Sequence, residues 1–214
     1  MSEGDSLLAH HFDSIEQQHE ATTLGMWLFL ATEIMFFGGA FTAYIIYRSA
    51  YPGAFAEASN LLNMNLGATN TAVLICSSLT MALAVYGAQT SNRKMLMIFL
   101  ALTILLGTTF LAVKAYEYHH KFEEHLVPGI DFHYQGANAR QVQLFFSLYF
   151  AMTGLHALHM VIGIGVLLVL LVQGWRGRFS SQYFSPIELT GLYWHFVDII
   201  WIFLFPLLYL IGRA

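Results

Sequence analysis

Charged residues are scarce in this sequence. Lys and Arg number nine and Asp and Glu 13, together 10% of the 214 residues, whereas 57% of the residues are hydrophobic. A soluble domain typically carries about 25% charged residues. All but four of the charges lie outside five long apolar stretches, at 24–47, 67–88, 95–118, 142–172 and 189–211. This segregation excludes a soluble globular enzyme.

Each apolar stretch is long enough to cross a membrane as a helix, which takes about 20 residues. Backbone polar groups in lipid must be satisfied within a helix or a closed barrel, and continuous apolar runs do not have the alternation of a barrel strand. The sequence therefore predicts an all-α fold, a polytopic membrane helix bundle with five transmembrane helices in a domain spanning 24–211.

Basic residues are absent from the first 23 positions, where a secretory signal peptide would carry its positive charge. This segment is acidic instead, and we expect residues 1–23 to be a retained N-terminal tail. Its acidic residues are Glu3, Asp5, Asp13, Glu16 and Glu20.

Several kinds of site are also missing. The one cysteine, Cys76, has no partner for an intrachain disulfide, and there is no glycine-rich phosphate loop, GxSxG elbow or CxxC pair. A net charge of −4 gives no reason to expect nucleic acid. The connection at 119–141 is rich in His and acidic residues, but it lacks the HExxH type of spacing, so we assign it no metal.

The basic residues do not orient the chain. Cytoplasmic loops should be richer in Lys and Arg, but four lie on each side of the predicted bundle: Arg93, Lys94, Arg176 and Arg178 on the N-terminal side, and Arg48, Lys121, Arg140 and Arg213 on the other. Trp27, Trp175 and Trp194 predict an aromatic belt at the N-terminal interface, but belts form at both surfaces.

Ionisable residues inside membrane helices are costly and are functional candidates by default. Besides Lys114 and Glu117, the predicted helices contain Glu33, His156, His159, His195 and Asp198. The i,i+3 spacing of His195 and Asp198 predicts that the carboxyl orients the imidazole. We expect Lys114 and Glu117 to form an ion pair at the membrane interface, where long side chains reach water.

Three functional interpretations of these groups compete with a structural one. Histidines on facing helices could ligate a haem, the polar groups could relay protons, or they could bind a redox metal. A haem-b membrane cytochrome and an ion-coupled transporter therefore stay open as function classes. The structural interpretation, which we favour, is that the groups hydrogen-bond to each other across helices and fix the packing.

Longer motifs carry a specific resemblance. The segments GMWLFLATEIMFFGGAFTAY at 25–44, LTMALA at 79–84, KAYEY at 114–118, TGLHALHMVIG at 153–163 and YWHFVDIIWIFLFPLLY at 193–209 occur in this order. Together they resemble subunit III of the haem-copper cytochrome c oxidases, from about residue 20 to 211. The resemblance maps the membrane-embedded Glu of that family onto Glu33, and further family residues onto Glu117, His156, His195 and Asp198.

The resemblance implies a non-redox role. Subunit III holds no haem or copper, which belong to subunits I and II, and it supports the stability of catalytic subunit I and proton uptake into it. The implied partners are subunits I and II, a small subunit IV and membrane lipids, with cytochrome c as electron donor to the complex. A quinol oxidase subunit III or an accessory protein of nitric oxide reductases is the alternative.

The resemblance also implies a location in the bacterial cytoplasmic membrane, with the N-terminus cytoplasmic and the C-terminus outside. Arg176 and Arg178 then lie in a cytoplasmic loop, as candidate contacts to phospholipid headgroups. Longer family members begin with two further helices that form a lipid-filled cleft. Those helices have no counterpart here, so we expect lipid or helices of another subunit to cover the face beside Glu33.

Overall fold

Five long helices form the structure, a computed structural model that describes residues 12, 14–129, 132–181 and 183–213. They are α1 (Ile15–Ala50), α3 (Met64–Gln89), α4 (Arg93–Glu123), α5 (Ala139–Trp175) and α6 (Ser185–Phe205), with a short α2 (Pro52–Asn60) after α1. Each long helix is apolar and long enough to cross a membrane. The predicted fold class, a membrane bundle of five helices, is confirmed.

The helices extend beyond the apolar stretches from which we predicted them. α1 begins at Ile15, inside the expected tail, because the Ser14 side chain accepts a hydrogen bond from the Gln17 amide and caps the helix. Asn63 and Asn92 cap α3 and α4 in the same way. α4 continues to Glu123, so the connection expected at 119–141 begins later. The first and last turns of these helices are polar, so a prediction from apolar stretches leaves them out.

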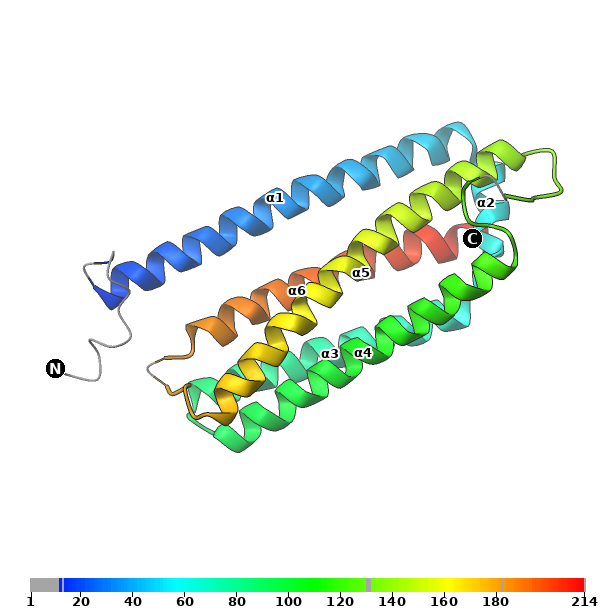
Figure 1. Ribbon diagram of the computed structural model, residues 1–214. Helices are drawn as coiled ribbons and strands as arrows, with labels where there is room; N and C mark the ends of the chain where they lie inside the picture. Colours follow the sequence, from blue (N-terminus) through cyan, green and yellow to red (C-terminus); the bar gives the residue numbers. More distant parts are fainter. Residues whose placement is uncertain (1–11, 13, 130–131, 182, 214) are drawn as a thin grey trace.

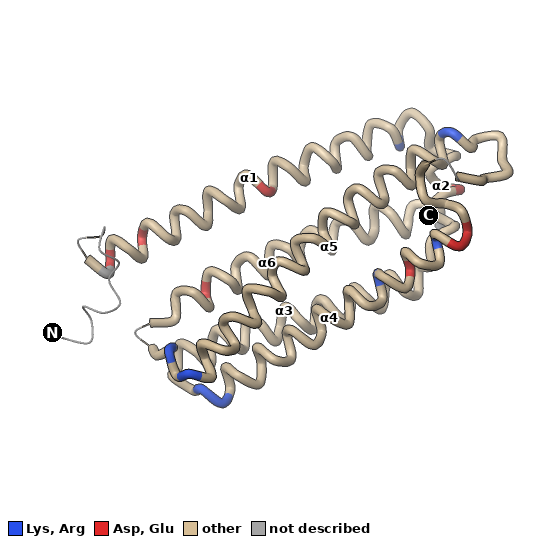
Figure 2. Tube along the Cα trace, in the orientation of Figure 1, with Lys and Arg blue, Asp and Glu red and all other residues tan. Residues whose placement is uncertain are grey.

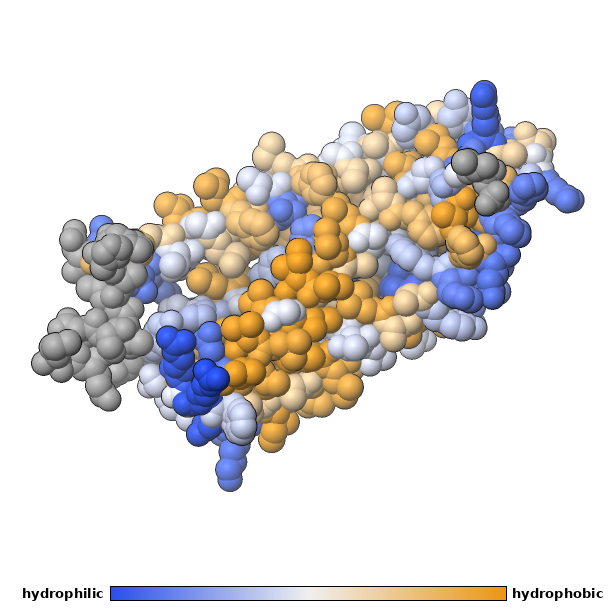
Figure 3. Space-filling view, in the orientation of Figure 1, coloured by the Kyte–Doolittle hydropathy of each residue, from blue (hydrophilic) through white to orange (hydrophobic). Residues whose placement is uncertain are grey.

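The helices lie roughly parallel to one axis, with α3 beside α4 and with α1 along the outside of α5 and α6 (Figure 1). α1 buries a narrow stripe, because its buried large residues are Leu30, Phe37 and Tyr44, at a spacing of seven. The rest of α1 is largely exposed and apolar; Met35, for example, is 77% exposed. Figure 3 shows hydrophobic side chains over the middle of the molecule and hydrophilic ones toward its ends, as a membrane requires.

The chain is irregular after the end of α6, and side chains of other helices donate hydrogen bonds to its backbone carbonyls. Pro206 has no backbone N–H to donate, and the chain continues as a π-helix, η2 (Pro206–Leu210), and a 3₁₀ turn, η3 (Ile211–Arg213). The Tyr44 hydroxyl donates to the Leu207 carbonyl at 2.5 Å, and the Ser59 hydroxyl donates to the Leu208 carbonyl at 2.7 Å. These two bonds tie α1 and α2 to the end of the chain.

Trp194 corrects the predicted aromatic belt. Trp27 and Trp175 are 58% and 71% exposed, but Trp194 is fully buried and donates its indole N–H to the Ser77 hydroxyl at 2.9 Å. Its ring fills the space left by Gly107 and Gly163, where an added Cβ would come within 2.8 Å and 2.9 Å of the ring. The small residues at 107 and 163 therefore accommodate a tryptophan, which hydropathy alone does not reveal.

We predict that Gly163→Ala destabilises the bundle by about 1–3 kcal/mol, because the new methyl group has to displace the buried Trp194 ring. The measurement is the thermal aggregation midpoint of the tagged chain in detergent-solubilised membranes. Gly165→Ala is the matched control, since it lies in the same helix and nothing is within 4 Å of an added Cβ. Equal midpoints for the two variants would contradict this packing.

Candidate functional site: polar groups inside the membrane helices

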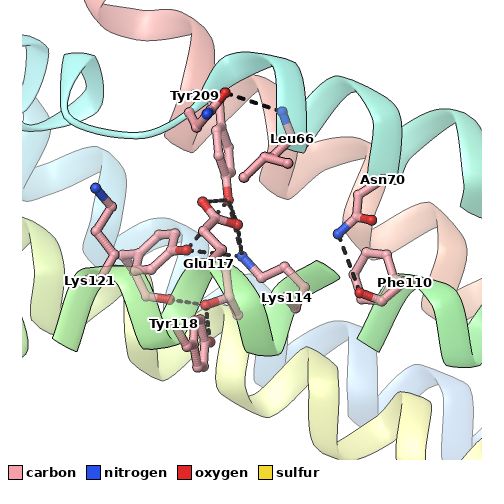
Figure 4. A network of polar contacts seen from close by, with 12 residues as sticks. Leu66, Asn70, Phe110, Lys114, Glu117, Tyr118, Lys121 and Tyr209 are labelled. Atoms are coloured by element: carbon pink, nitrogen blue, oxygen red, sulfur yellow. Dashed lines mark hydrogen bonds and ion pairs between the residues drawn. The ribbon is translucent and has the colours of Figure 1, made fainter. Parts of the chain in front are cut away.

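A buried ion pair lies where α4, α5 and η2 meet. Lys114 Nζ lies 2.9 Å from Glu117 Oε2, and it donates to the hydroxyls of Tyr149 and Tyr209 at 3.0 Å each. The Tyr209 hydroxyl lies 2.7 Å from Glu117 Oε1, and the three side chains point toward one another in Figure 4. The ammonium group also sits over the Tyr149 and Trp201 rings, 4.9 Å and 5.2 Å from their centroids.

This cluster confirms the predicted ion pair and corrects its location. Lys114 and Glu117 are only 3% and 2% exposed, so their charged groups lie inside the bundle and do not extend toward water at its surface. The predicted location was wrong because the tyrosine hydroxyls come from helices distant in sequence. Breaking a buried ion pair leaves an uncompensated charge, which makes the contact important for stability.

Lys121 and Glu124 repeat the arrangement seven residues later, and the sequence analysis missed it. Lys121 is 3% exposed and donates to the Leu61 carbonyl at 2.7 Å and to Glu124 Oε2 at 2.5 Å. The signal was present, because two Lys-x-x-Glu pairs at a spacing of seven lie on one helix face. The second pair fixes the connection between α2 and α3 to the end of α4.

Glu33 and His159 join α1 to α5. Glu33 Oε2 lies 3.1 Å from His159 Nε2, and the two side chains are 18% and 12% exposed. His159 Nδ1 lies 2.9 Å from the Leu155 carbonyl, which only accepts, so Nδ1 carries a proton. One proton then lies between Nε2 and the carboxyl, either on a carboxylic acid beside neutral imidazole or on an imidazolium beside carboxylate. The contact depends on this proton, because without it Nε2 and the carboxylate would be two acceptors facing each other.

His195 and Asp198 do not form the pair that their spacing predicts. His195 Nδ1 lies 2.7 Å from the Ser78 hydroxyl on α3. Asp198 is 3% exposed, and the same Ser78 hydroxyl lies beside its carboxyl. The i,i+3 spacing places both residues on one side of α6, but a hydroxyl on the neighbouring helix takes the imidazole. The predicted orienting role of Asp198 was wrong.

His156 lies apart from His159. It is fully buried between the rings of Phe110 and Trp201, at centroid distances of 5.4 Å and 5.2 Å, and neither ring nitrogen has a partner among the described residues. His159 instead contacts α1, so the histidines of α5 and α6 do not converge. Within residues 14–129, 132–181 and 183–213, no three His, Cys, Asp or Glu side chains are placed to hold a metal.

Basic residues gather at the end of the bundle where α3 passes to α4 and α5 to α6 (Figure 2). Arg176 and Arg178 are exposed there. Arg93 connects the two turns by donating to the Gly174 carbonyl at 3.1 Å and to the Trp175 carbonyl. Arg176 and Arg178, like Lys94, present their side chains to the surroundings, as a contact to a lipid phosphate requires.

The Tyr134 side chain fixes the long connection between α4 and α5 at the other end of the bundle. Its hydroxyl donates to the Glu57 carboxylate of α2, and this bond raises the pKa of Tyr134 above its usual value of 10.0. The connection is therefore attached to α2.

Comparison with known proteins identifies this arrangement. Residues 2–213 match the family model described as cytochrome c oxidase subunit III. The chain belongs to the cytochrome c oxidase subunit III family. It is a subunit III of a haem-copper terminal oxidase, in a five-helix form, and a membrane protein of the respiratory chain.

The relatives of this subunit III divide between two electron donors. A protein of Staphylococcus haemolyticus named probable quinol oxidase subunit 3 is 30% identical over 203 residues, 94% of each chain. One of Staphylococcus epidermidis with the same name is 31% identical over 210 residues, 96% of each chain. The cytochrome c oxidase subunit 3 of Alkalihalophilus pseudofirmus is 30% identical over 189 residues, 88% of this chain and 86% of the relative.

We predict that Lys114→Met lowers the free energy of unfolding of this subunit III by about 3–5 kcal/mol, because Glu117 is left buried without its cation. The thermal aggregation midpoint in detergent measures the loss. The control is Lys94→Met, since Lys94 is exposed and its replacement should cost less than about 0.5 kcal/mol. Similar midpoints for the two variants would show that the ion pair does not stabilise the bundle.

We predict that Glu33→Gln leaves subunit III in the purified oxidase, because an amide N–H₂ can donate to His159 Nε2 in place of the carboxyl. Glu33→Leu should weaken retention, since it leaves this nitrogen unpaired at a cost of about 1–3 kcal/mol. The ratio of subunit III to catalytic subunit after detergent purification measures both. Loss of the chain from the Gln variant would show that the contact requires an exchangeable proton.

Proposed function

We propose that this chain is a non-catalytic subunit that stabilises catalytic subunit I and supports proton uptake into it, in an oxidase that reduces oxygen to water and pumps protons. The observation that supports this role is that the Lys114–Glu117 ion pair is closed by tyrosines of other elements and that Glu33 is joined to a histidine of another helix. Lys114 and Glu117 are satisfied within the bundle, and Glu33 contacts His159. These contacts favour a packing role over a redox site.

The Glu33–His159 pair is the part of the chain best suited to assist proton uptake. It is partly exposed, and its shared proton can move between a carboxyl and an imidazole 3.1 Å apart. We propose that the N-terminus is cytoplasmic, so that the cationic side chains of Arg176 and Arg178 lie beside cytoplasmic lipid headgroups. Bound phospholipid would then cover this side of the subunit.

We propose that the chain assembles with subunits I and II and a small subunit IV, and that haem and copper lie in the first two. Cytochrome c is the proposed donor to the complex. A quinol is the second candidate, favoured by the names of the two staphylococcal relatives. The donor binds elsewhere in the complex under either alternative.

The test compares the purified oxidase with and without this chain. We expect the initial rate of oxygen consumption to be similar, because the haem and copper remain, and the activity to be lost sooner during continuous turnover. Proton uptake should be slower in the depleted enzyme, measured by the pH change of a lightly buffered solution. Equal lifetimes and equal proton uptake would contradict the proposed role.

The same preparation decides between the donors. Oxygen consumption with reduced cytochrome c and with a reduced soluble quinone is measured separately on the intact complex. A rate with cytochrome c alone supports the first candidate, and a rate with quinol alone supports the second. Readdition of the chain to the depleted enzyme is the control, since it should restore the lifetime of either activity.

A further inference from the structure

A groove lies between α3 and α6 on the outer, apolar surface of the bundle. It encloses about 370 Å³ and is lined mainly by aliphatic side chains. Its edges are exposed: Leu79 on α3 is 62% exposed, and Ile199 and Ile202 on α6 are 50% and 44% exposed. The lining residues on α3 recur at 75, 78, 79 and 82 and those on α6 at 195, 198, 199 and 202, so both walls extend over two helical turns. The groove therefore follows the helix axes.

The groove contains polar groups that the bundle itself leaves unused. Asp198 lines it and is 3% exposed, and the donor beside its carboxyl among the described residues is the Ser78 hydroxyl, whose single proton leaves at least one of the two carboxyl oxygens without a donor. The Ser78 hydroxyl, beside that carboxyl, is 2.7 Å from His195 Nδ1. A buried acceptor without a donor is costly in a hydrocarbon environment. The groove thus lacks a hydrogen-bond donor that has to come from outside this chain.

The depth of the groove limits what can supply that donor. Ser78 is the fifteenth of the 26 residues of α3, and Asp198 is the fourteenth of the 26-residue span Ser185–Leu210. Both residues therefore lie about 20 Å along the helix from either end, at a rise of 1.5 Å per residue. The hydrocarbon core is about 30 Å thick, so lipids present only acyl chains at this depth. An acyl chain has no hydrogen-bond donor.

The floor of the groove also permits close approach of a helix. Ser78 and Ala82 are four residues apart on the lipid side of α3, a spacing of small residues that lets two helices pack closely in a membrane. Apolar walls on both sides and a polar acceptor at the centre match a helix with one polar side chain on an apolar face. Interhelical hydrogen bonds of this kind contribute to association in bilayers.

We infer that the α3/α6 groove binds a transmembrane helix of a partner subunit of the oxidase, and that this helix donates a hydrogen bond to Asp198. The inference rests on the proposed function, since it requires that the chain is assembled in an oxidase. It identifies one surface of subunit III as an interface with the rest of the oxidase. The Ser78 hydroxyl and His195 extend the polar contact.

The test uses site-specific crosslinking in the intact oxidase in its native membrane. Cys76 is first replaced by Ser, and single cysteines are introduced as Ile202→Cys in the groove and as Val161→Cys on α5, which is 55% exposed. Each is labelled with a benzophenone maleimide and irradiated. We expect Ile202→Cys to crosslink to a membrane-spanning peptide of another oxidase subunit, identified by mass spectrometry, and Val161→Cys to give no such product.

Other products would overturn the inference. A crosslink from Ile202→Cys to lipid acyl chains, to an added quinone or to a second copy of this chain would mean that no partner helix occupies the groove. If the chain does not purify with an oxidase, the proposed function fails as well. If it does purify with one and the groove residue crosslinks only to lipid, the docking inference fails and the proposed function stands.

Variants of Asp198 test the hydrogen bond. Asp198→Asn keeps an acceptor oxygen of similar shape, whereas Asp198→Leu removes it and leaves the partner's donor buried and unpaired. We expect Asp198→Leu to raise the fraction of subunit III lost during detergent purification about tenfold and Asp198→Asn to raise it less. Folding of the chain is checked by its thermal aggregation midpoint. Equal retention of both variants and the unchanged chain would rule out the bond.

Discussion

The Lys114–Glu117 ion pair is the contact on which the arrangement of the other helices depends. In a hydrocarbon environment its charges cannot be hydrated, so every donor and acceptor has to be supplied by the bundle. The tyrosine hydroxyls of α5 and η2 supply them, and Trp201 of α6 covers the ammonium group. This requirement fixes α4, α5 and the end of α6 relative to one another, and the bonds from Tyr44 and Ser59 then attach α1 and α2 to that end.

The contact that joins helix α1 to α5 differs from the Lys114 cluster in its exposure and in its protons. It buries one stripe of large residues and meets α5 through a single polar pair, Glu33 with His159. That pair is partly exposed and shares one proton, whereas the Lys114 cluster is closed. The proposed role in proton uptake would use this separation, with a fixed ion pair in the core for stability and a contact that contains a shared proton at the periphery.

How much of the fold and of the polar contacts could be predicted from the sequence depends on how far apart in the chain the contacting residues lie. The number of helices and the Lys114–Glu117 ion pair depend on residues close in sequence, and both predictions were confirmed. The burial of Trp194 depends on Gly107 and Gly163 from two other helices, and the partner of His195 is Ser78 on α3. No local pattern contains this information. The Lys121–Glu124 pair was readable from its seven-residue repeat, and only its buried position required the structure.

Three acidic groups in the apolar parts of the membrane helices form a series in how far the chain satisfies them. Glu117 has a cation and a tyrosine hydroxyl, Glu33 has one imidazole, and Asp198 has beside it, in the described part of the chain, a serine hydroxyl that also contacts His195. Since unsatisfied carboxyls are costly in lipid, this order runs from groups that hold the subunit together to a group that needs another molecule. A subunit that works only inside a complex is expected to leave such an acceptor at the surface where its partner binds.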